Sequence, residues 1–151
     1  MRNKKSGKGF TIVELLIVIS ILAVLYNITA INVLGLQNEA RYSRIKGDLK
    51  TLRLAIDTYI KNKGVCPQED NYQRALILSK PKILEGNLFD PFGATVNTLY
   101  SYSTSANNQY YIVYSVGMRR NGSAGVDNRG ELIIEGSVIY ETNGYYNALD
   151  K

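Results

Sequence analysis

The sequence predicts an α+β fold, in which a long N-terminal helix with a transmembrane half and an amphipathic half packs on a small antiparallel β-sheet. Residues 10–63 contain no proline and keep one helical period. Three short runs after residue 97 have the composition or the alternation of β-strands. Between these two parts lie all three prolines of the chain. Helix first and strands afterwards is the pattern of an α+β domain.

Residues 1–9 form a short basic leader. Four of the 18 basic residues of the chain lie in it, namely Arg2, Lys4, Lys5 and Lys8. The formal net charge of +5 therefore belongs mostly to this leader, and the remainder is close to neutral. A duplex-binding domain needs a concentrated basic face. The distribution of charge argues against a nucleic-acid partner.

Residues 10–38 are predicted to be a transmembrane and assembly helix. Apart from Tyr26, the only ionisable side chain in this stretch is Glu14. A helix of this length rises far enough to cross about 30 Å of hydrocarbon. Basic residues before an apolar run predict a cytoplasmic N-terminus. Glu14 needs an explanation, because a carboxylate is costly in lipid.

The soluble domain is predicted over 39–151, and it starts with an amphipathic continuation of the same helix to about residue 63. Apolar residues recur here at steps of three or four positions, which places them on one stripe of the helix surface: Ile45, Leu49, Leu52, Ile56 and Tyr59. Gly64 follows as a helix stop signal. This stripe needs a partner, and a small sheet can supply it.

A loop region over 64–97, with one short helix at 71–79, leads to a predicted sheet region over 98–140. The strands are expected at 98–103, 109–116 and 130–134. The glycine-rich stretch 117–130 reads as an irregular loop. Residues after 134 are expected to form a weak strand or an edge tail.

The composition excludes several classes of enzyme. The chain has no histidine, which removes Ser–His–Asp and Cys–His catalysis and histidine-ligated zinc. Its one cysteine, Cys66, cannot form an internal disulfide, and a buried structural thiol is its expected role. No constellation of polar residues predicts a catalytic site. The chain is predicted not to be an enzyme.

Three interpretations compete for the N-terminal segment. An ordinary secretory signal would need a small-residue cleavage site after the apolar run, and "YNITA" (26–30) offers a poor one. A plain membrane anchor leaves Glu14 unexplained. The third is a processing and assembly signal, because "KGFTIVELLIVISILAVL" (8–25) resembles the class III signal of type IV pilins and pseudopilins.

This resemblance implies the pilin fold and a defined processing route. In that family a prepilin peptidase cuts between glycine and phenylalanine, and the new N-terminus is methylated. The matching bond is Gly9–Phe10, and Glu14 matches the family's assembly glutamate. The implied partners are further copies of the chain in a helical filament, minor pilins or pseudopilins, the inner-membrane assembly platform and the peptidase. The positive charge of a freed Phe10 amine and the negative charge of the Glu14 carboxylate can then pair, which offsets much of the free-energy cost of burying each of them.

The C-terminal half resembles the major pseudopilin of type II secretion. The shared order is a helix ending in "GVCP" (64–67), then "DPFG" (90–93), a tyrosine-rich hairpin and "YYIVYSVG" (110–117). In that subfamily the next loop holds calcium, and Asp127 and Asn128 are the candidate ligands here. Arg119 and Arg120 in the same loop would repel a cation. No cofactor is required by this interpretation, and calcium is the one candidate.

The sequence therefore predicts a structural filament subunit, stored as a single-pass precursor in the inner membrane and later part of a periplasmic or extracellular filament. A type II secretion pseudopilus that drives protein export is preferred. The alternative is a type IV pilus subunit for adhesion, twitching or DNA uptake. A membrane-anchored enzyme or receptor is a more remote alternative.

Overall fold

The computed structural model describes residues 10–145, and it describes residues 28–34 by their backbone alone. The chain divides into two compact units, one up to Ala40 and one from Arg41 onward. A single helix, α1, spans Ile12–Lys63 and so contributes to both units. The first unit contains the apolar part of this helix.

The predicted long helix is confirmed. The helix begins at Ile12 because Thr11 caps it, with the geometry described below. The first backbone hydrogen bond of the helix runs from the N–H of Leu15 to the carbonyl oxygen of Thr11 at 3.2 Å. At the other end Gly64 adopts a φ of +78° and donates its N–H to the Ile60 carbonyl. A glycine in this conformation ends a helix without the steric penalty of a side chain.

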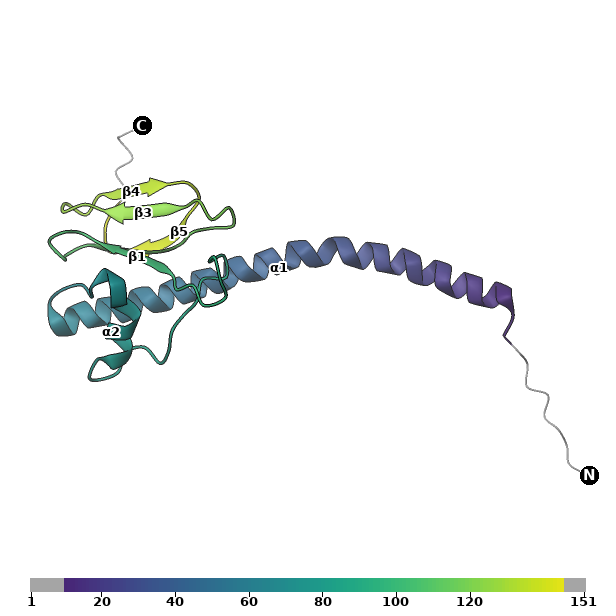
Figure 1. Cartoon of the computed structure of the whole chain (residues 1–151), viewed down its shortest axis with the longest axis horizontal. Coiled ribbons are helices and arrows are strands. Elements are labelled where there is room, and N and C mark those ends of the chain that lie inside the picture. Colours follow the sequence, from purple (N-terminus) through teal and green to yellow (C-terminus); the bar gives the residue numbers. More distant parts are fainter. Residues whose placement is uncertain (1–9, 146–151) are drawn as a thin grey trace, which may run out of the picture. The chain divides into compact units, whose positions relative to one another are not determined.

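The second unit continues with two short helical turns and five strands (Figure 1). The 3₁₀ turn η1 spans Glu69–Asn71 and α2 spans Tyr72–Leu78, close to the predicted short helix. A three-stranded antiparallel sheet has the order β1–β2–β5, and β3 pairs with β4 in a separate two-stranded sheet. The strands are β1 (Ser101–Thr104), β2 (Tyr111–Ser115), β3 (Ser123–Val126), β4 (Leu132–Glu135) and β5 (Ile139–Thr142).

The central strand β2 is covered on both faces. Tyr111 and Val113 point into a core shared with α1, whereas Ile112 packs with residues of β3 and β4. The helix contributes the predicted apolar stripe, whose first four members are buried and whose last member, Tyr59, is partly buried. Within the second unit the three-stranded sheet therefore lies between the amphipathic part of α1 and the β3–β4 pair.

One expectation about the sheet was wrong. The stretch 117–130 was expected to be an irregular loop, but Ser123–Val126 forms β3, which pairs with β4 in the register Val126 to Leu132. Of the two forms expected for the residues after 134, the structure shows the strand, because β5 pairs antiparallel with β2 as far as Thr142. The strand β3 was missed because most side chains of its sequence, "SAGV", have little preference for a strand, and pairing with β4 determines its conformation.

Within the part of the chain that the structure describes, no helix reaches the length and mean hydropathy that a membrane span requires. The transmembrane segment at 10–38 stays a prediction.

Candidate functional site

The start of α1 contains a reciprocal pair of hydrogen bonds between Thr11 and Glu14. Oε2 of Glu14 accepts hydrogen bonds from the backbone N–H of Thr11 at 2.9 Å and from its hydroxyl at 2.8 Å. In return the backbone N–H of Glu14 donates to the Thr11 hydroxyl oxygen at 3.2 Å. This is a capping box, in which the residue before the helix and the third helical residue satisfy each other's free N–H groups.

The capping box places the carboxylate of Glu14 beside the backbone of Thr11, one residue after Phe10. A negative charge in the first turn also interacts favourably with the helix dipole. The second carboxylate oxygen, Oε1, accepts no hydrogen bond from any described residue. Glu14 is therefore held in place by one oxygen and keeps the other available for a positive group.

The surroundings of this carboxylate are apolar. From Ile12 to Leu25 the helix exposes large hydrophobic side chains on every side, and Glu14 carries the only charge among them. A helix that is hydrophobic all round is normally covered by lipid or by other protein segments. A positive partner for Glu14 would be favoured in such a setting, because electrostatic attraction strengthens as the local dielectric falls.

The described region begins between the two predicted processing residues. Phe10 is described and exposed, and it lies directly before the capping box. Gly9 lies outside the described residues, so the structure does not place the Gly9–Phe10 bond. The sequence interpretation missed Thr11. The signal that would have found it is the spacing T-x-x-E in front of an apolar run.

The candidate calcium ligands lie between β3 and β4. Oδ1 of Asp127 accepts hydrogen bonds from the backbone N–H groups of Arg129 and Glu131, both at 2.8 Å. Oδ1 of Asn128 accepts the backbone N–H of Asn107 at 3.0 Å. The hydrogen bonds to Asp127, first that from Glu131, lower the pKa of its carboxyl group. Asp127 therefore clamps its own turn.

This donor set fits calcium poorly. Calcium takes six to eight oxygens, usually with several carboxylates. Among the described residues there is no group of three or more His, Cys, Asp or Glu side chains placed to hold a metal ion. Calcium was one candidate from the sequence and not a requirement, and the Discussion gives the experiment that tests it.

Comparison with known proteins first concerns the segment around the capping box. Residues 4–25 match the family described as the prokaryotic N-terminal methylation motif. The matched segment contains Gly9, Phe10, Thr11 and Glu14. The chain carries a prepilin-type methylation motif. The predicted class III signal is confirmed at the level of this motif.

Curated relatives extend the similarity beyond the motif. The chain is 29% identical over 81 residues to type II secretion system core protein G of Klebsiella michiganensis, covering 54% of this chain and 56% of the relative. The protein of the same name from Vibrio cholerae is 31% identical over 81 residues, covering 54% and 55%. That of Pseudomonas aeruginosa is 27% identical over 75 residues, covering 50% and 53%. The match spans about half the length of these relatives. No solved structure matches the chain significantly.

These findings agree with the fold. A prepilin-type methylation motif followed by a long helix on a small antiparallel sheet is a pilin-like α+β arrangement. The predicted resemblance to the pilins and pseudopilins is confirmed, and the similar proteins are named as core proteins of a secretion system.

Proposed function

We propose that this chain is a structural subunit of a type IV filament. A prepilin peptidase cleaves the membrane-held precursor between Gly9 and Phe10, the new N-terminus is methylated, and the mature chain assembles into a helical filament. Its partners are further copies of itself, minor pilins or pseudopilins and the inner-membrane assembly platform. The precursor crosses the inner membrane once with a cytoplasmic N-terminus, and the filament extends into the periplasm or beyond.

One observation carries this proposal. The methylation motif over 4–25 contains the expected cleavage bond, and directly after it the capping box holds Glu14 with one oxygen free. Cleavage would create an ammonium group on Phe10, next to the capping residue Thr11. An anion that is fixed at a helix start, in apolar surroundings and without a cationic partner among the described residues, suits that ammonium.

The pairing gives assembly its register. A buried ammonium and a buried carboxylate are each costly alone, and a close pair offsets much of this cost. Glu14 can meet the amine of its own chain or that of the neighbouring subunit. A subunit whose pair forms across the interface gains stability only when it docks at the correct height. The remaining apolar surface of the helix then packs against other helices.

We prefer a type II secretion pseudopilus that drives protein export, and the names of the similar proteins support this choice. The single free thiol at Cys66 also suits it, since a C-terminal loop closed by a disulfide needs two cysteines. The alternative is a type IV pilus subunit for adhesion, twitching or DNA uptake. Deletion of the chain separates the two, because loss of secretion favours the first and loss of twitching or adhesion favours the second.

Mass spectrometry of the mature N-terminus tests processing directly. We expect the chain isolated from its host to start with methylated Phe10. An intact Met1 would contradict the proposal and would favour the remote alternative of a membrane-anchored enzyme or receptor.

The substitution Glu14→Val tests assembly. We expect filament yield to fall more than about tenfold, because an unpaired buried charge costs about 3–5 kcal/mol. Cleavage at Gly9–Phe10 should continue. The measurement compares filament yield and the ratio of precursor to mature chain in cells that produce equal amounts of protein.

Glu39→Val is the matched control, since Glu39 is an exposed glutamate of the same helix beyond the apolar run. It should leave filament yield close to that of the wild type. A normal filament yield from Glu14→Val would contradict the proposed role of Glu14.

A further inference from the structure

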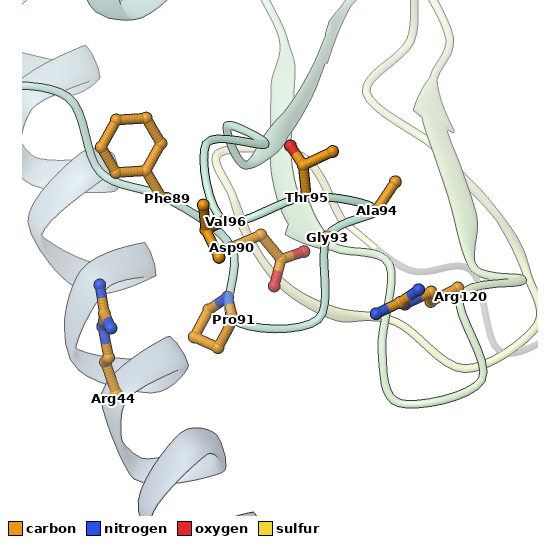
Figure 2. A pocket seen from close by; sticks show the side chains of 9 residues that line it. All are labelled: Arg44, Phe89, Asp90, Pro91, Gly93, Ala94, Thr95, Val96 and Arg120. Atoms are coloured by element: carbon orange, nitrogen blue, oxygen red, sulfur yellow. The ribbon is translucent and has the colours of Figure 1, made fainter.

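A cleft of about 360 Å³ lies beside the turn formed by residues 90–96, wholly within the second unit (Figure 2). Arg44 of α1 lies on one side of this turn, and Arg120 of the loop between β2 and β3 lies on the other. The two arginines come from elements far apart in the sequence. Neither residue of the capping box, Thr11 or Glu14, lines this cleft.

The turn is rigid because Asp90 ties it to β2. Oδ1 of Asp90 accepts hydrogen bonds from the N–H of Phe92 at 2.9 Å and from the hydroxyl of Ser115 at 2.8 Å. Oδ2 accepts the N–H of Val116 at 3.1 Å. The side chain is only 3% exposed. Asp90 therefore serves as an internal clamp, and three neutral donors of the chain stabilise its carboxylate.

Arg120 is anchored and yet keeps most of its donors free. Its Nε donates to the carbonyl of Phe92 at 3.1 Å, and its backbone N–H donates to the carbonyl of Gly117 at 3.0 Å. Its terminal nitrogens have no hydrogen-bond partner, and the guanidinium has no carboxylate within ion-pair distance among the described residues. In Figure 2 this guanidinium is directed toward the turn.

Arg44 supplies a second positive group. Its Nε lies 3.4 Å from Oδ2 of Asp48, an exposed contact that leaves both terminal nitrogens of Arg44 without a described partner. In addition, the backbone N–H groups of Ala94 and Val96, which line the cleft, donate to no described atom. The cleft thus gathers several unused donors beside Asp90, whose carboxylate already accepts three hydrogen bonds from the chain.

We propose that this cleft binds an oxyanion, a carboxylate or a phosphate group, between Arg120 and Arg44. The planar fork of a guanidinium matches both groups in a bidentate manner. Because Nε already fixes Arg120, little side-chain freedom is lost when its terminal nitrogens bind. In the sequence Arg120 already argued against a cation in the glycine-rich stretch, and in the structure it favours a ligand of the opposite charge.

Two sources can supply this chemistry. One is a free anion in solution, and the other is a carboxylate on a second copy of the chain. Anion binding in this cleft does not depend on the proposed filament function. Of the residues that carry that function, the two that the structure describes, Phe10 and Glu14, do not line the cleft, so the two proposals can fail separately.

The experiment uses the full chain, labelled with ¹⁵N in detergent micelles and titrated with inorganic phosphate or acetate against chloride at constant ionic strength. We expect saturable shifts of the amide signals of Ala94 and Val96. Arg120→Gln should weaken binding at least about tenfold, since it removes a charge-assisted pair. Arg119→Gln is the matched control, because Arg119 is the adjacent exposed arginine and does not line the cleft.

No saturable shift in the wild type, or equal affinity in Arg120→Gln, would overturn the proposal. If Arg120→Gln disturbs the turn, as judged by thermal unfolding, Arg44→Gln decides instead, since it leaves the turn intact. It should weaken binding at least about threefold, and an unchanged affinity in that variant would also overturn the site.

Sedimentation of the same variants separates the two sources. If a second copy supplies the carboxylate, phosphate and Arg120→Gln will both reduce self-association. If the ligand is a free anion, phosphate will bind while self-association stays the same in all variants. Sedimentation therefore identifies only the source of the ligand. Whether the cleft binds an oxyanion is decided by the amide shifts in the wild type and in the arginine variants.

Discussion

The carboxylate of Glu14 lies among apolar side chains, and Thr11 supplies its hydrogen bonds within the chain. From the sequence this charge has no partner other than a future amine. The structure adds a local partner that stabilises the helix start before any amine is free. A single residue can thus be tolerated in the precursor and still provide an acceptor for assembly.

Buried tyrosines are the second feature at the residue scale. Burial is the main cause that raises the pKa values of Tyr72, Tyr100, Tyr102 and Tyr111 above their ordinary value of 10.0. A folded-state pKa above the unfolded value gives stability that is complete below pH 10.0 and is lost as pH rises further. The second unit should therefore unfold in alkali.

We expect Tyr102→Phe to reduce this alkaline loss. Above pH 10 the wild type should lose about 1.4 kcal/mol per pH unit more than this variant, because one tyrosine fewer must ionise on unfolding. Cys66 and Glu69, which lie beside Tyr102, are unchanged in both proteins. Urea unfolding of the full chain at pH 9, 10 and 11, followed by circular dichroism, measures the difference.

Tyr145→Phe serves as the control, because Tyr145 is exposed. Its stability should follow that of the wild type at each pH. Parallel pH profiles for Tyr102→Phe and the wild type would show that Tyr102 does not stay protonated in the folded state.

At the scale of elements, the link between β2 and β3 depends on Gly117. Its φ is +73°, and a Cβ at this position would lie 2.2 Å from the carbonyl oxygen of Ser137, just before β5. This combines a left-handed conformation with a backbone that leaves no room. Only glycine satisfies both conditions without displacing the neighbouring strand.

Gly117→Ala should therefore destabilise the protein by at least about 2 kcal/mol. Gly125→Ala is the matched substitution within β3, where a Cβ meets nothing within 4 Å. It should be neutral or stabilise the protein by about 0.5–1 kcal/mol, because alanine loses less backbone freedom than glycine. Chemical unfolding of both variants measures the difference, and similar losses would contradict the assigned crowding at Gly117.

The turn between β3 and β4 is the element on which the calcium prediction depends. Asp127 already uses Oδ1 to hold two backbone N–H groups, and the candidate ligands include only this one carboxylate. We expect the thermal unfolding midpoint to be the same in calcium and in chelator. Asp127→Asn should lower the midpoint equally in both, because it weakens the clamp. A calcium-dependent rise in the wild type that disappears in Asp127→Asn would instead establish a calcium site.

At the scale of the whole chain, the long helix and its buried stripe could be predicted from the sequence, because spacing along a helix determines which side chains share a face. Ile45, Leu49, Leu52 and Ile56 are buried as expected. The strands were less predictable. The residues of β3 have little intrinsic preference, and pairing with β4 decides their conformation.

The candidate sites divide in the same way. Phe10 and Glu14 are recognisable because they belong to one short contiguous motif. The capping role of Thr11 was available from local spacing and was overlooked. The cleft between Arg44 and Arg120 could not be predicted, since its residues meet only after α1, the turn at 90–96 and the loop after β2 have packed. Local chemistry is readable in a sequence, and distant juxtaposition is not.

The reactivity of the single thiol, Cys66, can report how often the core of the second unit opens. It is 5% exposed in the core, and burial raises its pKa. In the folded chain it should react slowly with thiol reagents at pH 8, at a rate set by transient exposure. A pulse of reagent followed by mass spectrometry counts molecules that have opened, without an added label. Immediate modification in native buffer would show that the core around Cys66 opens freely.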